Sequence, residues 1–106
     1  MSKPRQSQIQ LREWWISHCG WCHREIGEDE PRLVAGLKFS EPKDYRKARG
    51  RAIEFKLATG RSVIACGVMP DSQAKKEGKD LLVMVCSEEC REALSTAMYE
   101  EWGIES

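Results

Sequence analysis

The sequence of 106 residues has no long apolar run and few glycines and prolines. The longest uninterrupted apolar stretch, residues 81–86, has six residues, whereas a membrane-spanning helix needs about 20. The first six residues hold no apolar stretch of the kind that a secretory leader carries. The 8 glycines, 4 prolines and 41% hydrophobic residues exclude a collagen-like or a disordered chain. We therefore expect one small cytoplasmic domain with no membrane partner.

The sequence also lacks the patterns of common active sites. It has no glycine-rich phosphate loop and no pair of carboxylates with a spacing that defines acid–base catalysis. Its two histidines, His18 and His23, flank one cysteine pair, and the helix expected after Ser87 holds none, which argues against a ββα-metal nuclease. We therefore expect a protein that is not an enzyme and has no small-molecule substrate.

Five cysteines are many for a chain of this length. In a reducing compartment cysteines more often hold metal or do redox chemistry than form disulfides. Four of them form two pairs with metal-ligand spacing, Cys19-Gly20-Trp21-Cys22 and Cys86-Ser87-Glu88-Glu89-Cys90. These pairs predict one structural Zn²⁺ held by Cys19, Cys22, Cys86 and Cys90. Four thiolates close the coordination shell, so the ion would have no open position for catalysis.

Other uses of the same cysteines stay open from the sequence alone. The first pair is similar to a thioredoxin-type redox motif, but the residues after it lead into strands rather than into the helix of a βαβ unit. An iron–sulfur centre could use the same four thiolates. We expect Cys66 to be a core residue because it follows Val63-Ile64-Ala65. His18 and His23 are interpreted as neighbours of the metal rather than ligands.

The pattern of apolar residues predicts an α+β domain with about four antiparallel strands and a C-terminal helix. Ser87 is a good N-cap, Leu94, Met98 and Trp102 recur at helical spacing, and Gly103 suits the end of the helix. We predict a flexible N-terminus over residues 1–8 and a single zinc-binding domain over 9–106. The strands are expected at 32–39, 51–57, 62–68 and 81–85, a helix or strand at 9–16, and a basic loop at 40–51.

The two cysteine pairs also carry a resemblance to a known family. A CxxC turn, intervening strands and then Cys86-Ser87-Glu88-Glu89-Cys90-Arg91 at a helix start resemble the treble-clef zinc fingers of the TRASH and MYM type. The chain differs from them in the 63 residues between Cys22 and Cys86 and in having His23 where many such turns have glycine. The resemblance implies a treble clef enlarged by a hairpin and a basic loop, in a class whose members bind RNA, protein or metal.

Charge is balanced over the whole chain, with 17 basic and 17 acidic residues, but it is unevenly distributed. Residues 38–61 carry eight bases against three acids, and residues 86–106 carry six glutamates against one arginine. The basic segment predicts a surface that neutralises phosphates, although a solvated loop facing the acidic helix explains the same charges. The residues predicted to contact RNA or DNA are Lys43, Tyr45 (by stacking on a base), Arg46, Lys47, Arg49, Arg51, Lys56 and Arg61.

Tryptophans support a second function. The chain has four, and Trp14 and Trp15 are adjacent near its start. Tryptophan is favoured as an anchor in protein interfaces. The alternative prediction is therefore a protein-interaction adaptor or a small subunit of a larger complex, which binds its partner through Trp14 and Trp15. The two functions are compatible, because a subunit of a ribonucleoprotein assembly would perform both.

Overall fold

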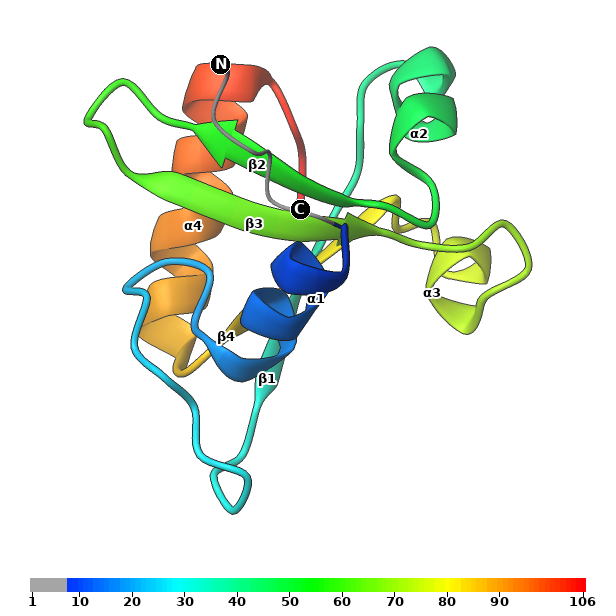
Figure 1. Ribbon diagram of the computed structural model, residues 1–106. Helices are drawn as coiled ribbons and strands as arrows, with labels where there is room; N and C mark the ends of the chain where they lie inside the picture. The colour runs from blue at the N-terminus through cyan, green and yellow to red at the C-terminus, as the bar shows by residue number, and fades with distance from the viewer. Residues whose placement is uncertain (1–7) are drawn as a thin grey trace, which may run out of the picture.

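The computed structural model describes residues 8–106 (Figure 1). The four strands form one antiparallel sheet in the order β1-β4-β3-β2, and a long helix follows the last strand, so the predicted α+β class is confirmed. The predicted flexible N-terminus lies outside the described residues except for Gln8, which begins the first helix. The elements are α1 (Gln8–Ser17), β1 (Leu33–Leu37), α2 (Pro42–Ala48), β2 (Ala52–Lys56), β3 (Ser62–Gly67), α3 (Gln73–Lys76), β4 (Leu81–Val85) and α4 (Glu88–Trp102).

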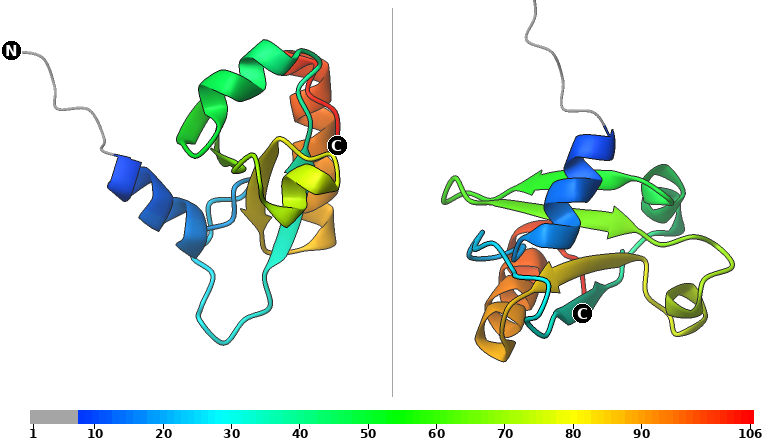
Figure 2. Two further views of the ribbon diagram at one scale, coloured as in Figure 1. Left: turned by 90° about the vertical axis from the view of Figure 1, so that its right-hand side faces the viewer. Right: turned by 60° about the horizontal axis from the view of Figure 1, so that its bottom comes forward.

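The two central strands of the sheet, β3 and β4, are paired over only part of their length. β1 pairs with β4, and β2 pairs with β3, over five residues each. In contrast, β3 and β4 pair only at Cys66 with Leu82 and at Gly67 with Leu81. Beyond these two pairs the strands diverge, as the views in Figures 1 and 2 show. This divergence leaves a gap between the start of β3 and the end of β4.

The helix α4 covers one face of the sheet and supplies much of the core. It begins at the predicted cap, where the Ser87 hydroxyl accepts a hydrogen bond from the Cys90 N–H at 3.2 Å, and it ends at Gly103, which has a φ of 66°. Leu94 and Met98 are fully buried, together with Leu37, Leu81, Val83 and Val85 of the strands. No helix within residues 8–106 combines the length and the apolarity that crossing a membrane requires.

The helix α1 lies across the opposite face, against β2, β3 and β4 (Figure 2). The sequence left open whether residues 9–16 form a helix or a strand, and the structure shows a helix. Polar contacts with strand backbones hold it in place. The Gln8 side-chain amide bonds both the N–H and the C=O of Ala52, at 2.7 and 2.9 Å. The Trp15 Nε1 donates to the Leu82 carbonyl at 2.9 Å. These bonds stabilise a helix that has no fully buried residue.

The basic loop predicted over 40–51 contains the short helix α2. Pro42 stands in the first turn, where its missing N–H costs nothing, and Asp44 complements the positive end of the helix. Tyr45 and Ala48 are buried, which anchors the helix to the end of β3. The segment 69–80 likewise holds a single turn, α3, because the Ser72 hydroxyl accepts the Lys75 N–H. Both helices are too short to leave a periodic apolar pattern.

Gly67 generates the first prediction. A Cβ atom at this position would lie 1.9 Å from the Ala48 carbonyl oxygen, which belongs to the backbone and cannot rotate away. We expect Gly67→Ala to displace α2 and to lower the free energy of unfolding by about 1–3 kcal/mol. Gly27→Ala is the control, because a Cβ there meets only ordinary contacts with Glu30, the nearest at 3.4 Å. Urea denaturation measures both variants, and equal stabilities would contradict the assigned packing of α2 on β3.

Candidate metal centre

The first cysteine pair lies at the tip of a tight hairpin over residues 17–26. A bridge between His18 and Glu25 begins the hairpin, and the Cys19 N–H donates to the Arg24 carbonyl at 2.8 Å. The His23 N–H then donates to the Cys19 carbonyl at 3.0 Å, with His23 in the left-handed region at a φ of 65°. In the zinc fingers that the sequence resembles, this position often holds glycine. We call residues 17–26 the knuckle.

The knuckle fills the gap between β3 and β4. On one side the Gly20 N–H donates to the Met84 carbonyl at 2.6 Å. A Cβ at Gly20 would lie 2.1 Å from Cγ1 of Val83, so only glycine permits this approach to β4. On the other side the His23 Nε2 lies 2.6 Å from the Ser62 carbonyl oxygen at the start of β3. The knuckle is therefore fixed to both diverging strands.

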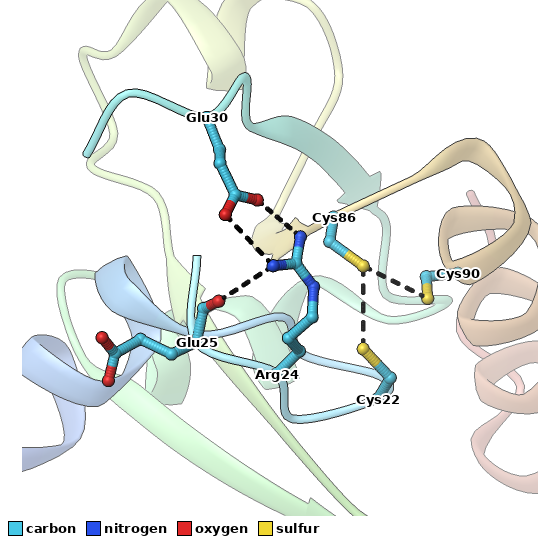
Figure 3. Close-up of polar contacts among 6 residues, drawn as sticks. All are labelled: Cys22, Arg24, Glu25, Glu30, Cys86 and Cys90. Atoms are coloured by element: carbon cyan, nitrogen blue, oxygen red, sulfur yellow. Dashed lines mark hydrogen bonds and ion pairs between the residues drawn. The ribbon is translucent and has the colours of Figure 1, made fainter. Parts of the chain in front are cut away.

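The second pair lies where β4 passes into α4. Cys86 directly follows β4, and Cys90 lies in the first turn of α4. Because the Ser87 cap orients that turn, the sulfur of Cys90 comes within 3.7 Å of the sulfur of Cys86. The docking of Gly20 onto β4 brings the knuckle to the same point, where the sulfurs of Cys22 and Cys86 are 3.6 Å apart (Figure 3).

The four sulfurs form one compact cluster. The Sγ atoms of Cys19, Cys22, Cys86 and Cys90 all lie within 4.8 Å of one another. A tetrahedral ion with metal–sulfur bonds of about 2.3 Å needs sulfurs about 3.8 Å apart. The separations of 3.6 Å between Cys22 and Cys86 and of 3.7 Å between Cys86 and Cys90 agree with this requirement. The four cysteines are therefore positioned to hold a single metal ion.

The environment of the cluster favours a cation. Burial raises the pKa of the Cys19 thiol, but backbone N–H groups of the knuckle and of Cys86 outweigh it and bring the pKa down to about 7. Burial raises the pKa of Cys22, and it raises the pKa of Cys90 to about 12, with nearby sulfurs adding to both shifts. Because thiolates at these distances repel one another, all four ionise near neutral pH only when a cation is bound among them.

Arg24 places a positive charge next to the cluster (Figure 3). Its guanidinium donates to both carboxylate oxygens of Glu30, at 3.2 and 2.6 Å, and to the Glu25 carbonyl at 3.2 Å. Hydrogen bonding to Glu30, followed by hydrogen bonding to the Cys86 sulfur, raises the pKa of Arg24. The other nearby arginine, Arg91, is ion-paired with Glu88. The bonds to Glu25 and Glu30 therefore hold the guanidinium of Arg24 beside Cys86.

The remaining candidate ligands lie outside the cluster formed by the described residues. The His18 ring stacks on Trp14 at a centroid distance of 4.6 Å, and its Nδ1 is 2.8 Å from the Ser17 hydroxyl. The contact between His23 and Ser62 directs that ring toward β3. Cys66 is half-buried on β3, where burial raises the pKa of its thiol. The metal cluster within residues 8–106 consists of the four paired cysteines.

Tyr45 has a different role from the one that the sequence suggested. The residue is buried, and its hydroxyl donates to the Val68 carbonyl at 2.9 Å. The Lys75 ammonium lies 3.8 Å from the centroid of its ring. The prediction that Tyr45 stacks on a base is therefore wrong, because the residue anchors α2 and its ring is covered. Position along the chain could not reveal this, because α2 itself was not predicted.

The other predicted contact residues divide into engaged and free side chains. Arg61 donates to the Trp21 carbonyl and lies 4.3 Å from the centroid of the Trp21 ring, so its side chain is engaged by the knuckle. Lys43 is ion-paired with Glu41 at 3.1 Å. Five more are exposed and form no ion pair with any of residues 8–106, namely Arg46, Lys47, Arg49, Arg51 and Lys56.

The structure adds Arg12 to this group of cations. Its guanidinium donates to the Gly50 carbonyl, between Arg49 and Arg51. The two partners are 38 residues apart in the chain, and α1 and the basic segment meet only in the folded domain. No local sequence pattern could have assigned Arg12 to the basic surface.

Comparison of the chain with protein-family models, with curated proteins and with solved structures finds no match. The metal centre is therefore interpreted from its own geometry and chemistry.

Substitution of single cysteines tests the cluster. Cys22 is exposed, so Cys22→Ser removes a ligand without opening a cavity in the core. We expect this variant to lose tight metal binding and several kcal/mol of folding free energy, because a structural metal site contributes on the order of 10 kcal/mol. Cys66→Ser is the matched control and should retain one ion per chain. Native mass spectrometry after refolding with Zn²⁺ measures the ion, and equal metal content in both variants would contradict the assignment.

Proposed function

We propose that this chain is a non-catalytic, zinc-stabilised module that binds nucleic acid through its exposed basic segment, residues 43–61. The donor set supports zinc. Four cysteine sulfurs form a soft, tetrahedral site, which favours Zn²⁺ over the hard cations Mg²⁺ and Ca²⁺. When bound, the ion cross-links the knuckle to the start of α4.

The arrangement of the ligands supports a treble-clef type of site. Two cysteines come from a knuckle and two from the start of a helix, with a β-hairpin between them in the chain. The four sulfurs would complete the coordination shell, so a zinc ion here would hold no water to activate. The same closure argues against a redox role for Cys19 and Cys22, since both thiolates would be committed to the metal. The site therefore has a structural role in this proposal.

The proposed contact with nucleic acid rests on one observation: exposed cations without acidic partners. Arg46, Lys47, Arg49, Arg51 and Lys56 form no ion pair with any residue of the range 8–106. They follow one another along α2 and the edge strand β2 (Figure 1). Such side chains gain more from neutralising phosphates than cations that are already paired. Several such cations in one segment can neutralise several phosphates of a nucleic acid.

The acidic helix does not neutralise these cations. Four ion pairs occur among residues 8–106, and none joins the basic segment to α4. The basic segment and α4 are instead joined by a hydrogen bond from the Ala58 N–H to the Glu101 carboxylate at 2.5 Å, which neutralises no cation. The interpretation of the segment as a loop facing its own acidic helix therefore has less support than a surface that faces a polyanion.

The adaptor alternative has weaker support. Trp14 and Trp15 are half-buried and engaged inside the domain, Trp14 with His18 and Trp15 with Leu82. A tryptophan that anchors a partner needs a face that is free to enter the partner's pocket. Of these two, Trp14 has a ring face covered by His18. The exposed cations described above therefore support nucleic acid as the partner more than the two tryptophans support a protein.

The salt dependence of binding tests this function. We expect wild-type protein to bind a fluorescent oligonucleotide with an affinity that falls steeply with salt. Replacing Arg46, Lys47, Arg49 and Arg51 together by alanine should reduce the slope of log K against log salt by roughly 3, since each phosphate contact contributes about 0.7–0.9. Fluorescence anisotropy over a range of NaCl concentrations measures the slope.

Arg32→Ala is the control, because Arg32 is exposed and lies outside the segment. Its slope should match that of the wild type. Zinc-loaded protein that binds no oligonucleotide, or a quadruple variant with an unchanged slope, would exclude nucleic-acid binding through this segment. Capture of a protein partner that survives the quadruple substitution would then favour the adaptor.

A further inference from the structure

An apolar pocket adjoins the basic segment at Gly50. It lies between α1, the end of β3, the start of β4 and the segment before α3, and its volume is about 470 Å³. This volume falls within the range of pockets that hold small organic groups, about 300–1,000 Å³. The side chains that form it are mostly apolar and include Trp15, Ile16, Val68, Met69 and Leu82.

One wall of the pocket is a fixed aromatic side chain. The bond from Trp15 Nε1 to the Leu82 carbonyl, 2.9 Å long, holds the indole against β4. At the rim, Ile16 and Met69 are 51% and 55% exposed, although large apolar side chains at such positions are usually covered. The pocket therefore offers an apolar, partly aromatic surface that water reaches.

The rim on the side of α2 is cationic. Arg12 lines the pocket and donates to the Gly50 carbonyl. Arg49 and Arg51 flank Gly50, and both are exposed without an ion pair to any described residue. A ligand of this pocket thus meets an apolar interior and the guanidinium of Arg12, with Arg49 and Arg51 on either side of the lining residue Gly50 in the chain. A nucleotide, with its flat base and its anionic phosphate, has the same division of properties.

We infer that the pocket receives one unstacked base of a single-stranded nucleic acid, while Arg12, Arg49 and Arg51 contact the phosphates on either side of that base. The inference rests on the proposed function and deepens it, because it specifies that the bound nucleic acid is single-stranded. A base in a duplex is stacked on both faces and paired along its edge, so it cannot enter such a pocket without being extruded. An unpaired base has a free face that stacks on an aromatic side chain irrespective of sequence.

Oligonucleotides that differ only in their bases give the most direct test. Zinc-loaded wild-type protein is titrated with labelled oligothymidylate, with an abasic oligomer of the same length and charge, and with a duplex. We expect the oligothymidylate to bind at least about 5-fold more tightly than the abasic oligomer, which retains the phosphates but has no base to insert. Equal binding of all three ligands would overturn the inference and leave the proposed function standing, whereas binding of none would overturn both.

Substitutions on α1 give a second, independent test. Trp15→Ala should weaken binding of oligothymidylate by roughly 5- to 150-fold, which is the range for loss of one stacked base. The slope against salt should stay unchanged because no cation is removed. Trp14→Ala is the matched control, since Trp14 is also half-buried on α1 but contacts His18 and does not line this pocket. It should bind as the wild type does.

Exposed rim residues provide a variant that leaves the core intact. Ile16→Ala together with Met69→Ala should weaken binding of oligothymidylate and leave binding of the abasic oligomer unchanged. Circular dichroism and metal content establish that each variant is folded. If folded Trp15→Ala and the rim variant both bind as tightly as Trp14→Ala, the base does not enter this pocket and the inference is wrong.

Discussion

The fold depends on bringing together four sulfurs from two distant parts of the chain. Cys22 and Cys86 are 64 residues apart in sequence, yet their sulfurs are 3.6 Å apart. Closing so long a loop costs conformational entropy. A metal bound by all four thiolates would offset part of this cost and would act on the folded state alone, because the complete site forms only when the knuckle and the start of α4 come together. The knuckle meets this constraint by lying between the diverging parts of β3 and β4 and bonding to both.

Two glycines show how closely the backbone must approach itself at the two ends of β3 and β4. Gly20 brings the knuckle onto Val83 and Met84, and Gly67 brings the end of α2 onto β3. Neither position has a positive φ, so their requirement comes from space rather than from backbone conformation. The knuckle and α2 are thus held in the same way, by a strand backbone in contact with an irregular segment. At the knuckle the four cysteines add a second constraint, which α2 lacks.

The features that the sequence could predict are those encoded locally. The spacing within each cysteine pair, the Ser87 cap and the alternation in 51–57 each depend on a few neighbouring residues, and the corresponding elements were predicted. The helix α2 was missed because its seven residues, four of them charged, carry no readable apolar period. The role of Tyr45 was mistaken for the same reason, since its burial follows from α2. The pocket beside Gly50 combines α1 with the end of β3 and the start of β4, and only the tertiary fold brings them together.

The cysteine cluster and the basic surface lie at different places in the fold, so the proposed function would separate stability from binding. β3 connects them, with Ser62 at the knuckle and Gly67 at α2. The cysteine cluster lies at the end of β4, where β3 and β4 have diverged. Arg49 and Arg51 lie at the other end of these strands, where β3 and β4 are still paired. A closed thiolate site needs no access for a ligand, and the cations need no metal to keep their charge. The sheet therefore joins the cluster to the basic surface through backbone pairing, while the chemistry of each site stays independent of the other.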